Sequence, residues 1–314
     1  MLNLIQLRVS FNCSLEKGAS MALGLIGLGK MGMSLALRLK SQGVNDLVVW
    51  DRDALAQDRA RANSLKVLND ASEVCQASEM VMTVINDDAG IHQLYFGEKG
   101  LLTKDIKDKV FIEMSTIQPQ TVRDLGLRVL AMGGHLIGAP MMGTVVSALN
   151  GSLFLPIGGE PADLIRAKPY LDLIASETRL IGPLGTGHVV KLISNLTMAA
   201  YIQSLAEGLA LASQEGLELK AVLDVLALSP SANAWLKFRG SELTHPSDEV
   251  TLDIASLRKD MLNAMVTGIS KGVPMDLTSS LVTTLSGAVA CGHGKRDIAH
   301  MPSILREQWV QKPA

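Results

Sequence analysis

Short apolar runs alternate with polar or amphipathic stretches along the first part of this chain. The apolar runs lie at residues 22–26, 47–50, 80–85, 110–114, 135–138 and 153–157. Runs of this length fit buried strands, and the stretches between them fit helices or loops. The alternation predicts an α/β fold whose mainly parallel sheet is covered by helices on both faces.

The second part of the chain shows little strand pattern. A Gly- and Pro-rich stretch at residues 181–187 suits a hinge. After it, one long and largely apolar helix is predicted, followed by shorter ones. These helices are expected at residues 188–213, 219–228, 256–270 and 277–290. The pattern therefore predicts an all-α C-terminal region.

Three segments follow from these patterns. Residues 1–20 are irregular and are expected to form a mobile extension, because they lack the basic start and sustained apolar stretch of a secretory signal. Residues 21–182 are expected to form a Rossmann-like domain. Residues 183–314 are expected to form an all-α domain for substrate binding and oligomerisation, joined to the first domain by a long interdomain helix.

Composition narrows the class of protein. A net charge of -2, with 19% charged residues, gives no basic stripe for nucleic acid. No apolar run reaches the length of a membrane span, so no membrane contact is expected. The cysteines Cys13, Cys75 and Cys291 are far apart, which favours free thiols and a cytoplasmic location. The six histidines have no metal-ligand spacing, so no metal is expected.

A glycine-rich turn lies between the first predicted strand and the first predicted helix. Its residues are Gly27, Leu28, Gly29, Lys30, Met31 and Gly32. Gly27 permits a tight turn, Gly29 allows close approach of a pyrophosphate, and Gly32 lets the helix pack near the strand. The free N–H groups at the helix start favour phosphate. All six residues are therefore expected to contact a nicotinamide dinucleotide.

An acidic residue follows the second predicted strand. Asp51 lies 24 residues after Gly27, close to the separation at which a carboxylate reaches the adenosine ribose. Such a carboxylate favours NAD over NADP. The neighbouring Arg52 leaves NADP open, because a guanidinium can hold a 2′-phosphate. The alternative for Asp51 is an ordinary residue of a strand-end turn.

Two hydroxyl side chains directly follow the strand predicted at residues 110–114. Ligands of parallel sheets bind beyond the carboxyl ends of the strands. Ser115 is therefore expected at the substrate and Thr116 at the cofactor. The alternative is that both cap a helix ahead of Pro119.

Lys191 and Asn195 lie in the long apolar helix. Their spacing of four places both side chains on one helix face. A buried ammonium is costly unless it has a partner or a task. The alternative is a lysine whose amine extends to solvent from the edge of the helix.

Four segments together resemble the β-hydroxyacid dehydrogenase family, the group that includes 3-hydroxyisobutyrate dehydrogenase and tartronate semialdehyde reductase. They are GLIGLGKMGMSLALRL at 24–39, GAPMMGTVVSALNGSL at 138–153, GTGHVVKLISN at 185–195 and LRKDMLNAM at 257–265. The resemblance covers nearly everything from Met21 onward. It implies an NAD(P)-dependent dehydrogenase or reductase that transfers hydride between nicotinamide and a small 3-hydroxy acid or semialdehyde.

The resemblance also implies roles for particular residues. Lys191 would be the general acid/base, and Asn195 would orient the substrate or the lysine amine. Lys259 would approach the cofactor or the substrate. Asp260 would hold Lys259 by charge pairing or cap the local structure. Burial would lower the pKa of Lys191 towards neutrality.

The second segment departs from the family pattern Asp-Ala-Pro-Val-Ser-Gly-Gly. Gly138 stands in place of the first Asp, Met142 in place of the Ser and Thr144 in place of the last Gly. Met142, Gly143 and Thr144 are still expected to contact substrate, with backbone N–H groups that can bind an anion. A more apolar pocket wall is expected. The alternative is a drift that leaves the substrate class unchanged.

Two other functions fit parts of the sequence. An imine reductase has a similar fold, but those enzymes usually lack a lysine at the position of Lys191. A dinucleotide-binding module without catalysis is the other, and the retained Lys191 and Asn195 disfavour it. Long apolar helices often form subunit contacts, so a homodimer or homotetramer is expected.

Overall fold

An eight-stranded sheet forms the centre of the N-terminal part in this computed structural model, which describes residues 22–310. The expected extension at residues 1–20 lies outside the described residues. The strands are β1 (Leu23–Ile26), β2 (Leu47–Trp50), β3 (Lys66–Val67), β4 (Met80–Thr83), β5 (Val110–Glu113), β6 (His135–Gly138), β7 (Leu153–Gly158) and β8 (Ala175–Gly182). Their order in the sheet is β3-β2-β1-β4-β5-β6-β7-β8. Only β6 and β7 pair antiparallel, so the predicted mainly parallel sheet is confirmed.

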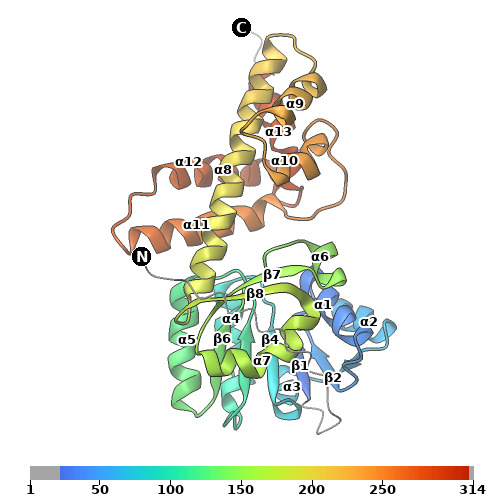
Figure 1. Cartoon of the computed structure of the whole chain (residues 1–314), viewed down its shortest axis with the longest axis vertical. Helices are drawn as coiled ribbons and strands as arrows, with labels where there is room; N and C mark the ends of the chain where they lie inside the picture. The colour runs from blue at the N-terminus through green and yellow to red at the C-terminus, as the bar shows by residue number, and fades with distance from the viewer. Residues whose placement is uncertain (1–21, 311–314) are drawn as a thin grey trace, which may run out of the picture.

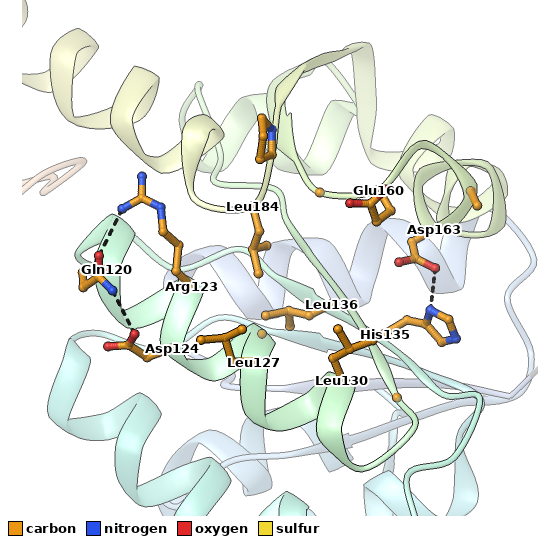
Figure 2. Close-up of a pocket in the computed structure, with 15 residues that line it drawn as sticks. Gln120, Arg123, Asp124, Leu127, Leu130, His135, Leu136, Glu160, Asp163 and Leu184 are labelled. Atoms are coloured by element: carbon orange, nitrogen blue, oxygen red, sulfur yellow. Dashed lines mark hydrogen bonds and ion pairs between the residues drawn. The ribbon is translucent and has the colours of Figure 1, made fainter.

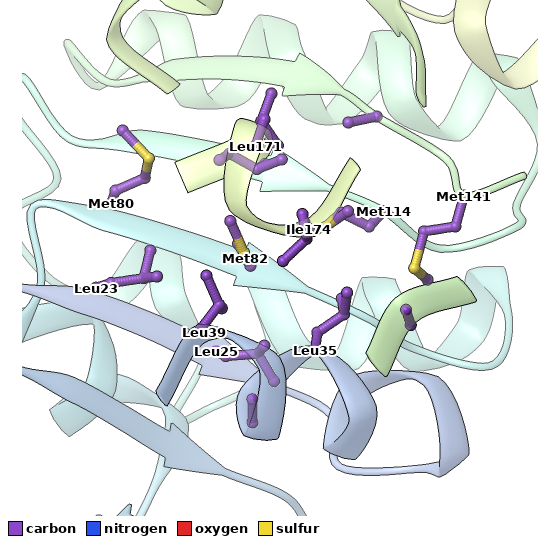
Figure 3. Close-up of a cluster of buried hydrophobic side chains, with 14 of the residues drawn as sticks. Leu23, Leu25, Leu35, Leu39, Met80, Met82, Met114, Met141, Leu171 and Ile174 are labelled. Carbon is purple, nitrogen blue, oxygen red and sulfur yellow. The ribbon is translucent and has the colours of Figure 1, made fainter. Parts of the chain in front are cut away.

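Helices cover both faces of this sheet (Figure 1). They are α1 (Lys30–Ser41), α2 (Ala54–Ala62), α3 (Ala71–Ala77), α4 (Asp88–Phe96), α5 (Pro119–Ala131), α6 (Val145–Asn150) and α7 (Pro161–Ile174). One core lies on the side of α1, α6 and α7, and Figure 3 shows that methionines as well as leucines fill it. The other core lies on the side of α3, α4 and α5, around Tyr95 and Phe111. The two-sided burial explains why the strands are apolar throughout.

The C-terminal part is helical, as predicted. Its helices are α8 (Thr186–Gln214), α9 (Leu219–Leu228), α10 (Ala234–Arg239), α11 (Ile254–Ile269), α12 (Asp276–Ala288) and α13 (Met301–Val310). The long α8 starts against β7 and continues beyond the sheet, where α11, α12 and α13 pack on it (Figure 1). It therefore joins the two parts of the molecule.

The start of α8 lies very close to the sheet. A Cβ at Gly187 would lie 2.1 Å from the carbonyl oxygen of Pro156 in β7, and Gly185 has a φ of +89° at the helix N-cap. Only glycine permits this approach and this backbone conformation. The Gly-rich hinge thereby brings the first turns of α8 against the sheet.

The length of α8 corrects the expectation that no apolar segment of the chain is long enough to span a membrane. This helix is long and apolar enough to cross a membrane by length and composition alone, with 33% of its most apolar window buried. The core helix of a soluble protein meets the same test. Its contacts with β7 and three other helices account for its apolar character.

Some elements were not predicted. The short β3 and the helices α10 and α13 lack a clear period in the sequence. Strand β8 is mostly exposed along its length, so it has no buried apolar run to mark it. It pairs in parallel with β7 and extends the sheet.

Candidate active site

The glycine-rich turn has the geometry of a phosphate-binding loop. Gly27 has a φ of +97°, and a Cβ on it would lie 2.1 Å from the carbonyl oxygen of Val84. A Cβ at Gly32 would lie 1.8 Å from the carbonyl oxygen of Gly27. At Gly29, in contrast, a Cβ would meet no atom within 4 Å. The first and last glycines are thus required by packing, whereas the middle one faces open space at the start of α1.

Asp51 directly follows β2 and is tied to this loop. Its carboxylate accepts hydrogen bonds from the backbone N–H groups of Leu28 and Asp53, the latter over 2.8 Å. A pocket of about 500 Å³ opens beside it. Its lining includes Gly29, Asp51, Arg52, Arg59 and Gln93. This pocket has the position and polarity for the adenosine half of a dinucleotide.

Lys191 lies in α8 where this helix faces α11, and its side chain is half-buried. Burial lowers the pKa of its amine, the negative charge of Asp260 raises it, and the positive charge of Lys259 lowers it further. The direction of the net shift is downward, which brings the amine closer to proton exchange near neutrality. The lowered pKa is the shift expected for Lys191.

Asn195 lies one turn further along α8 and is buried. Its Nδ2 donates a hydrogen bond to Oδ2 of Asp260 over 2.7 Å. The other carboxylate oxygen, Oδ1 of Asp260, lies 3.1 Å from Nζ of Lys259, at an angle that does not make a hydrogen bond. Asp260 therefore connects Asn195 to Lys259 between α8 and α11.

Lys259 crosses from α11 to the sheet. Its Nζ donates to the carbonyl oxygens of Thr116 (2.6 Å) and Asn86 (2.8 Å), which lie in the loops after β5 and β4. The amine thus lies beyond the carboxyl ends of two adjacent parallel strands, where ligands of such sheets bind. Thr116 is brought to the cluster of Lys191, Asn195 and Lys259 through this contact.

Two other contacts hold the C-terminal part on the sheet. Nζ of Lys30, in the glycine-rich turn, donates to the carbonyl oxygen of Val250 over 2.7 Å. Asn263 of α11 donates to Asp88 over 3.4 Å. These contacts join the C-terminal part to the start of α1 and to the start of α4.

Ser115 is buried and does not cap α5, so the capping alternative for it is wrong. It is 2% exposed, and its hydroxyl accepts a hydrogen bond from the N–H of Ile85 over 2.7 Å. The N-cap of α5 is Gln118, without a side-chain capping bond, so neither Ser115 nor Thr116 caps that helix. The Ser115 hydroxyl joins the loop after β5 to the loop after β4.

Beneath Ser115 lies a buried acid that the sequence did not reveal. Glu113 is fully buried at the end of β5, where its carboxylate accepts from the Ser115 N–H (2.8 Å) and from the Thr83 hydroxyl (2.6 Å). Burial raises the pKa of Glu113 to about 7, against the lowering effect of these hydrogen bonds. A single acid within the otherwise apolar strand was the available signal.

Two of the three backbone N–H groups at residues 142–144 already have partners within the protein. The N–H of Met142 donates to the carbonyl oxygen of Phe154 over 2.9 Å. Thr144 forms a capping box with Ser147 at the start of α6, which uses its N–H and its hydroxyl. Gly143, with a φ of +141°, lies between these two. The amides of Met142 and Thr144 are thus occupied within the protein.

A larger pocket, of about 730 Å³, lies away from this cluster. Figure 2 shows leucines of α5, together with Leu136 and Leu184, among the side chains that line it, and the contact of His135 with Asp163 at one side. None of the predicted site residues lines it. Among residues 22–310, no group of three or more His, Cys, Asp or Glu side chains is placed to hold a metal.

Two family models match consecutive parts of the chain. Residues 22–182, just over half of it, match the NAD binding domain of 6-phosphogluconate dehydrogenase. Residues 185–305 match the NAD-binding domain of NADP-dependent 3-hydroxyisobutyrate dehydrogenase. The two matches meet at the hinge before α8, and both describe binding of a nicotinamide cofactor.

Known proteins agree with these matches. Glyoxylate/succinic semialdehyde reductase 1 of Arabidopsis thaliana is 25% identical over 279 residues, which covers 89% of this chain and 96% of the relative. The structure of a 3-hydroxyisobutyrate dehydrogenase of Mycobacterium tuberculosis aligns with a TM-score of 0.81 at 23% identity, covering 91% of this chain and 99% of that one. An imine reductase of Myxococcus stipitatus shares the fold more distantly, with a TM-score of 0.63 at 15% identity over 91% of this chain and 99% of that one. The chain is therefore an oxidoreductase of the dehydrogenase type and belongs to the β-hydroxyacid dehydrogenase family.

Proposed function

We propose that this enzyme transfers hydride between a nicotinamide cofactor and a small 3-hydroxy acid or the matching semialdehyde, with Lys191 as general acid/base. The observation that carries the proposal is the position of the Lys191 amine. It is half-buried near Asn195 and Asp260. The negative charge of Asp260 and the positive charge of Lys259 both act on its pKa. Lys259 in turn reaches the carboxyl ends of β4 and β5.

The proton steps follow from this placement. The bound nicotinamide supplies hydride to a carbonyl carbon or accepts it from an alcohol. In reduction, the Lys191 ammonium donates a proton to the oxygen of the carbonyl as negative charge develops there. In oxidation, the neutral amine takes the proton from the alcohol. The lowered pKa of Lys191 makes both protonation states accessible near neutral pH.

Asn195 has a positioning part in this scheme. Its Nδ2 is committed to Asp260, which fixes the orientation of the carboxamide. The amide oxygen then remains available to accept from the Lys191 ammonium or from a substrate hydroxyl. A fixed acceptor one turn from the amine would hold the proton donor in the orientation that the reaction needs.

The cofactor would lie across the carboxyl ends of β1, β2, β4 and β5. The amides at residues 28–32 would hold the pyrophosphate at the start of α1, and Asp51 would accept from the adenosine ribose. We propose a preference for NAD, because each oxygen of Asp51 can accept a further hydrogen bond beside those from Leu28 and Asp53. Arg52 and Arg59 line the same pocket and are the groups that would favour NADP.

The substrate class is proposed from the named relatives and from the segment at 142–144. The relative from Arabidopsis is named for glyoxylate and succinic semialdehyde. Because the amides of Met142 and Thr144 are occupied, carboxylate binding is expected to depend on Gly143, Asn195 and Lys191 more than on a backbone nest. The Met142 side chain would make one wall of the pocket apolar.

A kinetic panel tests this proposal. The protein is mixed with NADH or NADPH and a set of small carboxylate aldehydes and cyclic imines, and the loss of nicotinamide absorbance is followed. We expect turnover of at least one semialdehyde, with a lower KM for NADH than for NADPH. Turnover of imines alone would replace the proposal with an imine reductase. Cofactor binding without turnover of any compound would favour a binding module.

The assembly and the location are also proposed. Apolar side chains are exposed along the helical part, at Leu211, Val266, Ile269 and Leu277. We propose that exposed apolar side chains of this part are buried in a homodimer or homotetramer, because the long apolar helices of an all-α domain often form subunit contacts. Light scattering after gel filtration tests the subunit number. A cytoplasmic location is proposed from the cysteine pattern and is tested by cell fractionation.

A further inference from the structure

The ends of three adjacent strands carry a row of buried positions beneath the proposed site. Thr83 of β4 pairs in register with Glu113 of β5, and Glu113 pairs with Gly138 of β6. Register partners in a parallel sheet point to the same face. The hydrogen bond from Thr83 to Glu113 confirms this for the first two. The third position has no side chain of its own.

His188 of α8 fills the space at the third position. A Cβ placed on Gly138 would lie 2.7 Å from Cε1 and 2.8 Å from Nδ1 of the His188 ring. The ring is 1% exposed, and neither nitrogen has a hydrogen-bond partner among the residues that the structure describes. A residue with a side chain at position 138 therefore cannot coexist with His188 in this place. Gly138, which stands in place of the Asp of the family pattern, leaves the space that the His188 ring occupies.

The backbone of Ser115 lies where the row meets the active-site loops. Its N–H donates to Glu113 and its hydroxyl accepts from Ile85. Its main chain also lies beside the His188 ring, where it acts on the pKa of the imidazole although the geometry falls short of a hydrogen bond. The next residue, Thr116, offers its carbonyl oxygen to Lys259. A movement of the Ser115 backbone would therefore also move the carbonyl oxygen of Thr116 that accepts from Lys259.

His188 is also connected to the proposed catalytic amine through α8. It lies three residues before Lys191, a spacing that places both side chains on the same side of the helix. The imidazole is therefore anchored between the sheet and the loop after β5, one turn below Lys191. Through this anchor, the first turns of α8 and the turn at residues 115–116 are held relative to each other.

We propose that His188 is a positioning residue of this enzyme: its neutral imidazole donates an N–H to the main chain of Ser115 in the ligand-bound state, and Gly138 is required to make room for it. The inference rests on the proposed function of Lys191. According to this inference, the packing of His188 against Gly138 keeps Lys191 in a fixed position relative to the hydrogen bond between Lys259 and Thr116. A buried imidazole with no partner is costly, and a small movement of the Ser115 main chain toward the ring would give it one.

The first test compares side chains at position 188. His188→Leu removes the N–H donor and keeps an apolar group of similar bulk, whereas His188→Asn and His188→Gln keep a donor. Removing an unpaired buried polar group is not expected to lower the thermal midpoint. We expect His188→Leu to stay folded, to lose about 10-fold in kcat with little change in KM, and to show faster hydrogen exchange at the Ser115 and Thr116 amides. His188→Asn or His188→Gln should restore most of both signals.

Two outcomes would overturn the inference. One is a folded His188→Leu protein with wild-type kcat and wild-type exchange at residues 115–116. The other is a loss of kcat that neither donor variant restores. The exchange measurement needs no substrate and is made with and without NADH. It therefore still tests the role of His188 if no substrate is turned over. Absence of turnover would count against the proposed function and not against the role of His188.

A double-mutant cycle tests the steric half of the inference. Gly138→Ala should lower the thermal midpoint and kcat in the wild-type background, because its Cβ would collide with the His188 ring. In a His188→Ala background the same change should cost much less, which makes the two effects strongly non-additive. Additive effects would mean that the His188 ring does not need the space left at Gly138. The proposed dependence of His188 on Gly138 would then be wrong.

Discussion

Asn195 donates a hydrogen bond to Asp260 over 2.7 Å, and this buried contact joins α8 to α11 beside the Lys191 amine. The negative charge of Asp260 raises the pKa of Lys191, whereas burial and Lys259 lower it. Asp260 thus opposes the downward shift of the Lys191 pKa that the proposed general acid/base role requires.

Replacing this charge should move the pH profile of the reaction. Asp260→Asn keeps a polar group of the same shape and removes the negative charge, so the pKa of Lys191 should fall further. Reduction needs the protonated amine. Its kcat should therefore begin to fall at a lower pH than in the wild type. The measurement is kcat for reduction against pH, with Asp224→Asn on the exposed face of α9 as a control that should not shift. An unchanged pH profile in Asp260→Asn would show that the charge of Asp260 does not influence the pKa of Lys191.

Loss of the amine itself should affect chemistry more than binding. Lys191→Ala is expected to reduce turnover by about 100-fold or more, as the loss of a general acid does. NADH affinity, measured by calorimetry, should change little, because the proposed cofactor contacts lie in other residues. Lys220→Ala on α9 removes an equally long, exposed lysine and serves as the matched control. If turnover in Lys191→Ala equals that of the wild type, another group must supply the proton.

The proposed contact of Asp51 with the adenosine ribose gives a prediction about cofactor preference. Asp51→Ala should weaken NADH binding and narrow its advantage over NADPH, because it removes the carboxylate and leaves Arg52 and Arg59 in the same pocket. It also removes the bond to the Leu28 N–H, so some loss of affinity for both cofactors is expected. Titrations of each variant with NADH and NADPH measure the ratio. A constant ratio would show that Asp51 does not face the ribose.

Local patterns predicted the fold well, and the structure has the glycine-rich turn and the helix of Lys191 and Asn195 where they were predicted. The glycine spacing at Gly27 and Gly32 depends on a turn whose geometry is set within a few residues, and the structure shows that geometry. The spacing of Lys191 and Asn195 depends only on the helix. Such features can be predicted because the interactions that determine them are close in the chain.

Other features depend on contacts between distant segments. Ser115 and Thr144 have the residue type of ligand-binding side chains, but their hydroxyls bond to Ile85 and Ser147. Which partner a hydroxyl finds is settled by tertiary packing. The environment of Glu113 could not be predicted for the same reason, because its partner Thr83 lies 30 residues earlier on a neighbouring strand.

Glu113 and His188 should give the stability opposite dependences on pH. Burial raises the pKa of Glu113 from 4.5 to about 7, so its neutral form stabilises the fold. That contribution is complete below pH 4.5 and is lost as the pH rises through about 7. Burial lowers the pKa of His188 from 6.5 to about 3. Its contribution is present above pH 6.5 and is lost as the pH falls through about 3.

Glu113→Gln separates the two effects. Glutamine resembles the protonated acid and can bond to both Ser115 and Thr83, so the variant should match the wild type near pH 4.5. As the pH rises towards 8, the wild type alone must bury a carboxylate. The variant should then gain stability relative to it, on the order of 3 kcal/mol from a shift of this size. Urea unfolding midpoints at several pH values measure the difference, and Glu249→Gln, on an exposed loop, should show none. A difference that stays flat between pH 4.5 and 8 would mean that burial does not raise the pKa of Glu113 in the folded protein.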